Sequence, residues 1–385
     1  MQPLNLVRDQ AKMRVLLWSE AFWPHIGGVQ VLAARLLPAL QERGYDFTVI
    51  TAQDDSGDLK SSSYKGTRIY RYPFRKALAR DQFELFMTIK QEIATLKRNF
   101  APDVIHIYAF GPSALFHLNT QNSHLAPLLV TLHEQWPDPA FGSDNLLPRV
   151  LKCASRVTFV SANLLAHTNE RLTEPLACAS IIYNGLDGSS YRPGPLPLYR
   201  PRLLCLGRLV PGKRIDLALR ALASIRGCYP NVRMIIAGDG PSRSELENIA
   251  AELGVADVVD FIGWIPPDDV PAVINFATAV LMPSRNEGLP LVALETALMA
   301  RPLIAARVGG LPELIEDGDT GLLVDSEDPQ ALVKAIQFVL DHPRAAKAMG
   351  EAARKRALKL FAWERCVDAY DALYRKLAST QSPAL

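Results

Sequence analysis

Short apolar runs alternate along this chain with longer stretches in which apolar residues recur every three or four positions. Residues 14–18, Arg-Val-Leu-Leu-Trp, form the first run, and residues 29–44 follow it with leucines along one helical face. Short unbroken apolar runs are typical of strands buried on both faces, whereas the second spacing is typical of an amphipathic helix. Further strands are expected at residues 47–50, 103–107, 128–133 and 156–160. The alternation of strands and helices predicts a parallel sheet covered on both faces.

The pattern stops at residues 187–201 and then starts again. This stretch contains Gly188, Pro193-Gly194-Pro195, Pro197 and Pro201, a composition typical of a linker between domains. Strands are expected after it at residues 202–207, 232–237, 258–263, 279–282 and 302–307, and an amphipathic helix is expected from Phe361 to about residue 379. The sequence therefore predicts two Rossmann-like α/β domains, residues 1–186 and 202–360, with a cleft between them.

Composition and charge narrow the function classes. The length of 385 residues suits two domains, and 49% hydrophobic and 21% charged residues are ordinary for a globular protein. The net charge of +2 gives no general attraction to nucleic acid, and the five scattered cysteines form no zinc pattern and suit a reducing compartment. No apolar run approaches the ~18 residues that span a bilayer. We expect a cytoplasmic protein, with peripheral contact to the membrane left open.

Residues 60–80 are basic and aromatic and contain no acidic residue. A solvated strand and loop is one interpretation. Binding to an anionic membrane surface or to a phosphorylated acceptor is another, and base stacking with a nucleic acid is a third. The residues concerned are Lys60, Lys65, Arg68, Arg71, Arg75, Lys76 and Arg80, with Tyr64, Tyr70, Tyr72 and Phe74 between them.

Two features of the first half lie where parallel sheets bind ligands, beyond the carboxyl ends of strands. Gly27-Gly28 lies between the first strand and the first helix, where glycine allows the backbone to approach a ligand and free helix N–H groups bind an anion. His133 ends another strand and could bond a sugar hydroxyl or transfer a proton. A tight turn and a structural histidine are the plainer alternatives.

Residues 207–214, Gly-Arg-Leu-Val-Pro-Gly-Lys-Arg, nearly match the phosphate-binding pattern G-x-x-x-x-G-K-[ST]. The match fails at Arg214, which has no hydroxyl to hold Mg²⁺. Arg208 and Lys213 would still place two cations beside a glycine turn, and this arrangement favours a diphosphate clamp without a metal. A solvent-exposed basic turn is the alternative.

Two glutamates flank the start of a helix expected near Leu289 or Pro290. Glu287 and Glu295 are separated by eight residues, which is at most roughly 12 Å along a helix, and side chains on a helix lean toward its N-terminus. The positive end of that helix would hold a phosphate between them. Two ordinary surface glutamates are the alternative on spacing alone. Asp317-Gly318-Asp319 is interpreted as a turn rather than a metal site, because Asp and Gly are common turn residues.

The combined motifs resemble family 4 of the retaining nucleotide-sugar glycosyltransferases, which have the GT-B fold. The resemblance covers residues 15–377. Its main marker is E-x7-E at Glu287 and Glu295. The supporting motifs are Gly207-Arg208 with Lys213, Gly238-Asp239-Gly240-Pro241, Gly309-Gly310-Leu311-Pro312-Glu313, Asp317-Gly318-Asp319-Thr320-Gly321 and His25-Ile26-Gly27-Gly28-Val29.

The resemblance implies a role for each matching residue. Arg208 and Lys213 would hold the donor diphosphate, Glu295 would accept hydrogen bonds from the ribose, and His133 would touch the sugar near the reacting carbon. Glu287 would hold the donor sugar together with the backbone of Gly288, Leu289, Pro290 and Leu291. Gly27 and Gly28 would approach the phosphate from the other domain, and Gly263, Trp264 and Ile265 would contact the base.

The resemblance also implies that the final helix crosses back onto the first domain. The implied reaction is the transfer of a hexose from a nucleotide-diphosphate sugar to a hydroxyl acceptor, with retention and without a metal or other cofactor. The acceptor would be a saccharide, glycolipid or small molecule, such as a lipid-linked or cell-envelope saccharide. Tyr108-Ala109-Phe110 departs from the His-rich loop of many members, so acceptor identity does not carry over. An epimerase or hydrolase on the same fold, or a non-catalytic nucleotide-sugar-binding subunit, is the alternative.

Overall fold

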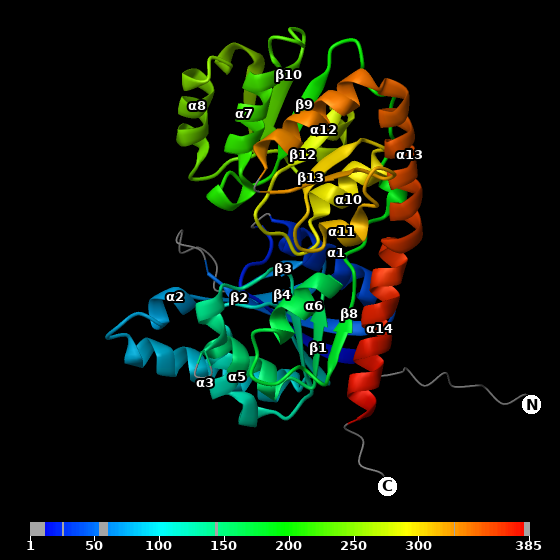
Figure 1. The fold of residues 1–385 in the computed structure, drawn as a ribbon. Helices are drawn as coiled ribbons and strands as arrows, with labels where there is room; N and C mark the ends of the chain where they lie inside the picture. The colour runs from blue at the N-terminus through cyan, green and yellow to red at the C-terminus, as the bar shows by residue number, and fades with distance from the viewer. Residues whose placement is uncertain (1–11, 25–26, 54–60, 143–144, 327, 381–385) are drawn as a thin grey trace, which may run out of the picture.

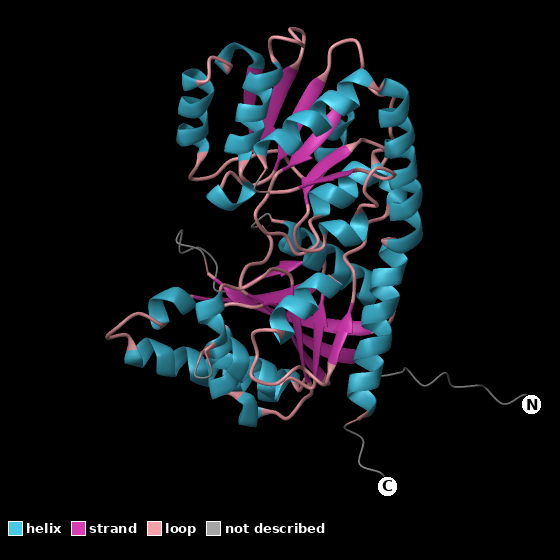
Figure 2. Cartoon of the chain, in the orientation of Figure 1, coloured by secondary structure: helices cyan, strands magenta, loops and turns pink. Residues whose placement is uncertain are grey.

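The structure, a computed structural model, describes residues 12–24, 27–53, 61–142, 145–326 and 328–380, and these form two lobes (Figure 1). In each lobe a sheet is flanked by helices (Figure 2). His25, Ile26 and Lys60, which belong to the motifs above, lie outside the described residues. Among the described helices, none is both long enough and apolar enough to cross a membrane.

The first domain has an eight-stranded sheet in the order β3-β4-β2-β1-β5-β6-β7-β8. Neighbouring strands are parallel, except that β3 and β4 form an antiparallel pair at the edge. The strands are β1 (Met13–Ser19), β2 (Tyr45–Ala52), β3 (Ser61–Tyr64), β4 (Thr67–Tyr72), β5 (Val104–Ala109), β6 (Leu128–Leu132), β7 (Arg156–Phe159) and β8 (Ala179–Ile181). The helices are α1 (Gly28–Gln41), α2 (Phe74–Ala77), α3 (Phe83–Phe100), α4 (Ala114–Asn119), α5 (Leu146–Cys153) and α6 (Ala162–Asn169).

The second domain has a six-stranded parallel sheet in the order β11-β10-β9-β12-β13-β14. Its strands are β9 (Arg202–Leu206), β10 (Arg233–Ala237), β11 (Val259–Gly263), β12 (Ala279–Met282), β13 (Leu303–Ala306) and β14 (Leu322–Val324). Its helices are α7 (Ile215–Ile225), α8 (Arg243–Glu252), α9 (Val270–Asn275), α10 (Leu291–Leu298), α11 (Leu311–Leu314), α12 (Pro329–Asp341) and α13 (Pro343–Leu360). The prediction of two doubly wound parallel-sheet domains is therefore confirmed.

The C-terminal helix crosses between the lobes as expected. The helix α13 runs along the second domain, and α14 (Trp363–Ser379) continues down the side of the first (Figure 1). Between these helices the backbone pairs with Leu186, whose N–H donates to the Phe361 carbonyl at 3.1 Å and whose carbonyl accepts from the Trp363 N–H at 3.2 Å. The two segments that pass between the domains, one at Leu186 and one at the junction of α13 and α14, are therefore hydrogen-bonded to each other.

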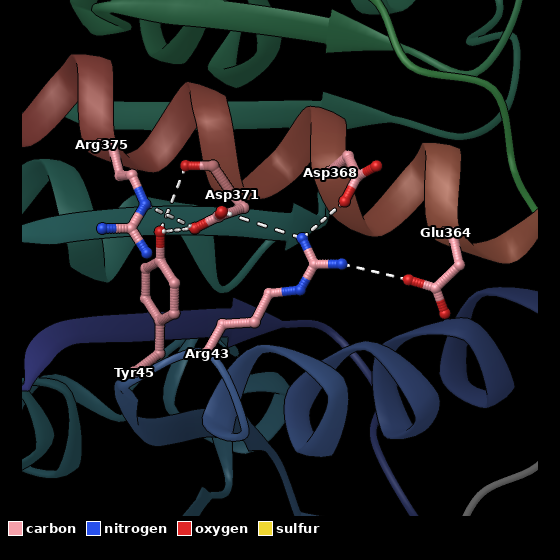
Figure 3. Close-up of polar contacts among 6 residues, drawn as sticks. All are labelled: Arg43, Tyr45, Glu364, Asp368, Asp371 and Arg375. Carbon is pink, nitrogen blue, oxygen red and sulfur yellow. Dashed lines mark hydrogen bonds and ion pairs between the residues drawn. The ribbon is translucent and has the colours of Figure 1, made fainter.

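Polar contacts along one side of α14 attach this helix to the first domain (Figure 3). The Arg43 guanidinium pairs with Glu364 at 3.1 Å and with Asp368 at 2.7 Å, and the Tyr45 hydroxyl donates to Asp371 at 2.6 Å. Glu364 and Asp368 are exposed, so their ion pairs contribute little, while Tyr45 is only 2% exposed. The buried tyrosine is therefore the firmer part of this contact.

A fully buried histidine makes the inner contact with α14. His106 on β5 bonds the Tyr374 hydroxyl at 2.6 Å through Nδ1 and the Thr131 hydroxyl at 2.7 Å through Nε2. Burial lowers the pKa of His106 well below its usual value, so the imidazole is neutral. Both ring nitrogens are satisfied by hydroxyl groups, which makes the docking of α14 specific as well as apolar.

The second half of the linker is fixed on the second domain. Arg301, 1% exposed, donates to the carbonyls of Gly194 at 3.1 Å and Pro195 at 3.2 Å. The Gly194 N–H donates in turn to Asn275 at 2.9 Å. From Gly194 onward the linker is therefore held by the domain that follows it.

Candidate functional site

A cavity of about 980 Å³ lies between the two domains, at the ends of their strands and the starts of their helices. This volume is large enough for a nucleotide sugar, since small-molecule sites measure about 300–1,000 Å³. The predicted residues that line it are Gly27, Gly28, His133, Arg208, Lys213, Trp264, Ile265, Glu287, Gly288, Leu289, Pro290, Leu291 and Glu295. Residues separated by more than 250 positions in the chain thus meet in one place.

Lys213 and Glu287 form an ion pair on the cavity wall. Lys213 ends a 3-10 turn (Pro211–Lys213) after β9, and Glu287 lies in the loop between β12 and α10. The lysine Nζ is 2.6 Å from Oε1 of Glu287, which is 8% exposed. The two loops are also joined by the Arg285 N–H, which donates to the Gly212 carbonyl at 2.9 Å. The ammonium group is consequently held at a fixed place beside the start of α10.

Arg208 supplies a second cation on the same wall. Its side chain is exposed and lines the cavity. The backbone that carries it is fixed, because the N–H of Leu209 donates to the Asp239 carbonyl at 2.9 Å. Arg208 and Lys213 thus line the same cavity as the residues that begin α10, and two cations together with a helix N-terminus could bind an anion.

Gly288 brings the two domains into contact within the site. A Cβ atom at this position would lie 1.8 Å from the carbonyl oxygen of His133, which belongs to the first domain. On its other side, the Gly288 carbonyl accepts the Gly310 N–H at 2.7 Å. Only glycine fits here, and its lack of a side chain sets how closely the domains approach.

His133 faces this contact from the end of β6. Burial lowers the pKa of His133 to about 4, so the ring is neutral at pH 7. The Tyr108 ring packs against it at 4.7 Å between centroids. The Tyr108 backbone partly opposes the pKa shift, yet neither buried ring nitrogen makes a hydrogen bond of normal geometry within the described structure. His133 is therefore a neutral, buried imidazole at the cavity wall.

Glu295 lies in the second turn of α10 and is 7% exposed. Its Oε1 accepts a hydrogen bond from the Tyr191 hydroxyl at 3.2 Å. Burial raises the pKa of Glu295 to about 7, although Tyr191 and the charge of Arg35 both oppose this shift. The carboxylate is therefore poised between its two protonation states near neutral pH.

The turn after β11 supplies a ring at the edge of the cavity. Trp264 is 51% exposed and lines the cavity together with Ile265. Gly263 is not part of the lining; it has φ +76° and its carbonyl accepts the Gly238 N–H at 2.7 Å. The structure thus places Trp264 and Ile265 at the cavity, whereas Gly263 ends the strand before them and does not line it.

The first domain contributes three charged residues to the cavity lining, Glu20, Arg75 and Glu134. The sequence analysis named Arg75 as part of the basic stretch and assigned no role to Glu20 or Glu134. Burial raises the pKa of Glu134, and the charge of Lys213 from the other domain opposes that shift. Glu134 follows His133 at the same strand end and could have been found by that position. Glu20 directly follows β1 and could have been found in the same way, whereas Arg75 lies on the short helix α2, where the hydrophobic pattern gives no signal.

The Asp317 side chain is used by its own turn. Its Oδ1 accepts the Leu323 N–H at 2.9 Å, and its Oδ2 pairs with Arg307. This agrees with the interpretation of Asp317-Gly318-Asp319 as a turn. Asp317 and Asp319 are absent from the lining of the cavity described above.

Comparison with known proteins matches both halves of the chain to family models. Residues 26–189 match "Glycosyltransferase Family 4", and residues 192–356 match "Glycosyl transferases group 1". The GDP-mannose-dependent alpha-(1-6)-phosphatidylinositol monomannoside mannosyltransferase of Mycobacterium tuberculosis is 30% identical over 380 residues, which cover 91% of this chain and 95% of that protein. The protein of the same name from Mycolicibacterium smegmatis is 36% identical over 237 residues, or 56% of this chain and 61% of its relative.

A solved structure supports the fold. Sucrose-phosphate synthase from Thermosynechococcus elongatus superimposes with a TM-score of 0.85 over 96% of this chain and 100% of that chain, at 23% identity. At this identity the likeness shows the architecture, whereas the relative that matches over nearly its full length shows the family. The chain belongs to glycosyltransferase family 4, nucleotide-sugar glycosyltransferases of the GT-B fold.

Proposed function

We propose that this hexosyltransferase moves a hexose, with retention of configuration, from a nucleoside-diphosphate sugar to a hydroxyl group of a saccharide, glycolipid or small-molecule acceptor. The observation that carries the proposal is the arrangement of Lys213, Glu287 and Glu295 around the start of α10, on the wall of one interdomain cavity. Arg208 and Lys213 would hold the diphosphate, Glu295 the ribose and Glu287 the sugar. Trp264 and Ile265 would lie against the base.

The charge on the leaving group decides which residues act in the reaction. As the bond between the anomeric carbon and the phosphate oxygen breaks, the diphosphate gains negative charge, and the acceptor oxygen forms the new bond to the same carbon. The proton of the acceptor hydroxyl passes to the departing phosphate. Lys213 and Arg208 stabilise the charge that develops on the diphosphate. On this basis we propose that transfer needs no metal and no other cofactor.

GDP-mannose is the donor that the relatives favour. The two relatives above carry it in their names, and one of them matches this chain over nearly its full length. The shape of the pocket determines which base and which sugar bind, so the proposed donor rests on the similarity to these two relatives.

The cavity-lining residues of the first domain favour an acceptor that carries a negatively charged group. Arg75 extends the cavity lining toward α2, while Glu20 and Glu134 can accept hydrogen bonds from hydroxyl groups. A phosphorylated polyol or lipid headgroup would present both kinds of group. The acceptor in the names of the two mannosyltransferase relatives, phosphatidylinositol monomannoside, has this chemistry.

A donor panel tests the proposal. Purified protein is incubated with GDP-mannose, UDP-glucose and other nucleotide sugars in EDTA, with and without inositol phosphate or phosphatidylinositol mannoside. We expect nucleoside diphosphate release that depends on the acceptor. Epimer or free sugar formed from the donor alone as fast as any transfer would favour the epimerase or hydrolase alternative. Loss of activity in EDTA would contradict metal independence.

Membrane contact through the basic stretch is proposed as a second property of the same protein. The side chains of Lys65, Arg68, Arg75, Lys76 and Arg80 are exposed, whereas Arg71 is buried and bonds Ser62 and the Trp23 carbonyl. The rings of Tyr72 and Phe74 are also buried, which leaves them unable to stack on bases. We expect the protein to float with anionic vesicles at low salt and not to float with neutral vesicles. Equal retention by both would contradict the proposal.

A further inference from the structure

A tyrosine of the linker holds one oxygen of the Glu295 carboxylate. The Tyr191 hydroxyl donates to Oε1 at 3.2 Å, and the tyrosine is 2% exposed. No residue in the part of the chain that the structure describes donates a hydrogen bond to Oε2. One oxygen is therefore occupied by the protein, and the other is left for a ligand on the cavity wall.

An arginine of the first domain acts on the same pair. Arg35 is half-buried on α1, the helix that begins at Gly28 on the opposite wall. Burial is the largest effect on both Tyr191 and Glu295 and raises both pKa values. Arg35 lowers the pKa of Tyr191 through a side-chain hydrogen bond and through its charge, and it lowers the pKa of Glu295 through its charge. A cation of one domain thus favours the ionised form of a carboxylate in the other.

Ionisation of Glu295 matters for binding a ribose. An ionised carboxylate is acceptor-only and bonds hydroxyl groups more strongly than a neutral acid does. Burial works against that state, and Tyr191 and Arg35 are the two groups that oppose burial. Their removal would leave Glu295 protonated over a wider range of pH.

We propose that Tyr191 is a positioning residue for the donor nucleotide. Tyr191 orients Glu295 by holding Oε1, and the charge of Arg35 supports the ionised form of that carboxylate. The inference rests on the proposed function, because it takes Glu295 as the residue that binds the donor ribose.

Calorimetry between pH 6 and pH 9 tests the inference, with GDP as the probe and UDP titrated in parallel. The variants are Tyr191→Phe, Arg35→Met and Arg35→Lys, and Tyr199→Phe is the matched control, since Tyr199 belongs to the same linker and is 90% exposed. At pH 7 we expect Tyr191→Phe to weaken binding by about three- to tenfold, the value of one hydrogen bond to a charged group reduced by rearrangement. The loss should shrink by pH 9, where Glu295 is ionised again.

Nucleotide affinity should change with pH as Glu295 ionises, and the midpoint of that change distinguishes a positioning role of Tyr191 from a merely structural one. Phenylalanine keeps the buried ring, so a merely structural Tyr191 would leave the midpoint where it is in the unchanged protein. Arg35→Met should raise the midpoint, and Arg35→Lys, which keeps the charge, should largely restore it. An unshifted midpoint in Tyr191→Phe would overturn the inference.

Glu295→Ala distinguishes this inference from the proposed function. If Glu295→Ala leaves nucleotide affinity unchanged, the donor-binding role of Glu295 is wrong and the inference falls with it. If Glu295→Ala weakens binding while Tyr191→Phe behaves like Tyr199→Phe, the inference alone is wrong.

Discussion

Lys213 and Glu287 hold each other through an ion pair of 2.6 Å on the cavity wall. The pair fixes the ammonium group on the cavity wall, where we propose that the leaving diphosphate develops its charge, and it keeps a buried carboxylate from being unpaired. The motif around Lys213 and the spacing of the two glutamates were sufficient to select these residues from the sequence. Their pairing was not predictable, because it depends on how two loops 74 positions apart fold against each other.

Lys213→Ala should reduce kcat more than donor affinity. The charge that Lys213 meets is largest in the transition state, so we expect kcat to fall by about 10²- to 10³-fold, as for the loss of one stabilising donor. Steady-state kinetics together with donor calorimetry measure the two effects. Lys355→Ala, an exposed lysine of α13, is the control. A change confined to KM would contradict the assigned role.

Gly288→Ala should separate the domains. The new Cβ would lie 1.8 Å from the His133 carbonyl, so the backbones must move apart at the site. We expect activity to fall by at least about tenfold, since small misplacement of reacting groups is costly. Gly227→Ala is the matched control, because no atom lies within 4 Å of a Cβ there. Activity of Gly288→Ala equal to that of the control would show that the contact has no bearing on the reaction.

At the scale of elements, the hydrophobic pattern located most of the strands that carry the site. The expected strand at residues 279–282 is β12 without change, and the one at residues 14–18 is β1 with a residue added at each end. The edge pair β3 and β4 was missed as a pair, because the alternation in β4 is broken by the buried Arg71. An arginine that is buried by bonding Ser62 and a carbonyl looks the same in a sequence as an exposed one.

The docking of α14 depends on more than its apolar face. Tyr374→Phe removes the hydroxyl that satisfies Nδ1 of the buried His106. We expect a loss of about 1–3 kcal/mol in the free energy of unfolding, the cost of a buried polar group left without a partner. Urea denaturation measures it. Tyr229→Phe, which removes an exposed hydrogen bond to Asp341, is the control and should change stability by less than about 0.5 kcal/mol.

At the scale of the whole molecule, the two-domain plan was predictable from periodicity and the crossing helix from the family resemblance, while the distribution of buried charge was not predictable. Strand and helix periodicity is local in the chain, so it can be read without the fold. Burial of His106 and approach of Arg35 to Glu295 arise only when distant segments pack, and the linker residue Tyr191 gave no signal at all.

Stability should fall as the pH drops below 6.5. Burial lowers the pKa of His106 and His117 well below 6.5 and that of His133 to about 4, so the unfolded chain binds protons that the folded chain does not. Each such histidine contributes a loss of up to about 1.4 kcal/mol per pH unit. Glu295, whose pKa is raised, acts in the opposite sense between pH 7 and 4.5.

Melting temperatures between pH 4.5 and pH 8 measure this dependence. Glu295→Gln removes an opposing group while keeping an acceptor for Tyr191, and should therefore make the fall toward acid pH steeper. A melting temperature that rises below pH 6.5 would contradict the burial of neutral histidines.

The most direct test of hexosyl transfer is proton NMR of one reaction. GDP-mannose and phosphatidylinositol mannoside are incubated with the protein, and GDP release and the new anomeric signal are followed together, with Lys213→Ala in a parallel tube. We predict GDP release matched by a new α-mannosyl signal, both reduced by the substitution. A β-linked product would contradict retention. If no nucleotide sugar in the panel is consumed, and calorimetry detects no binding of any of them, the central claim is wrong.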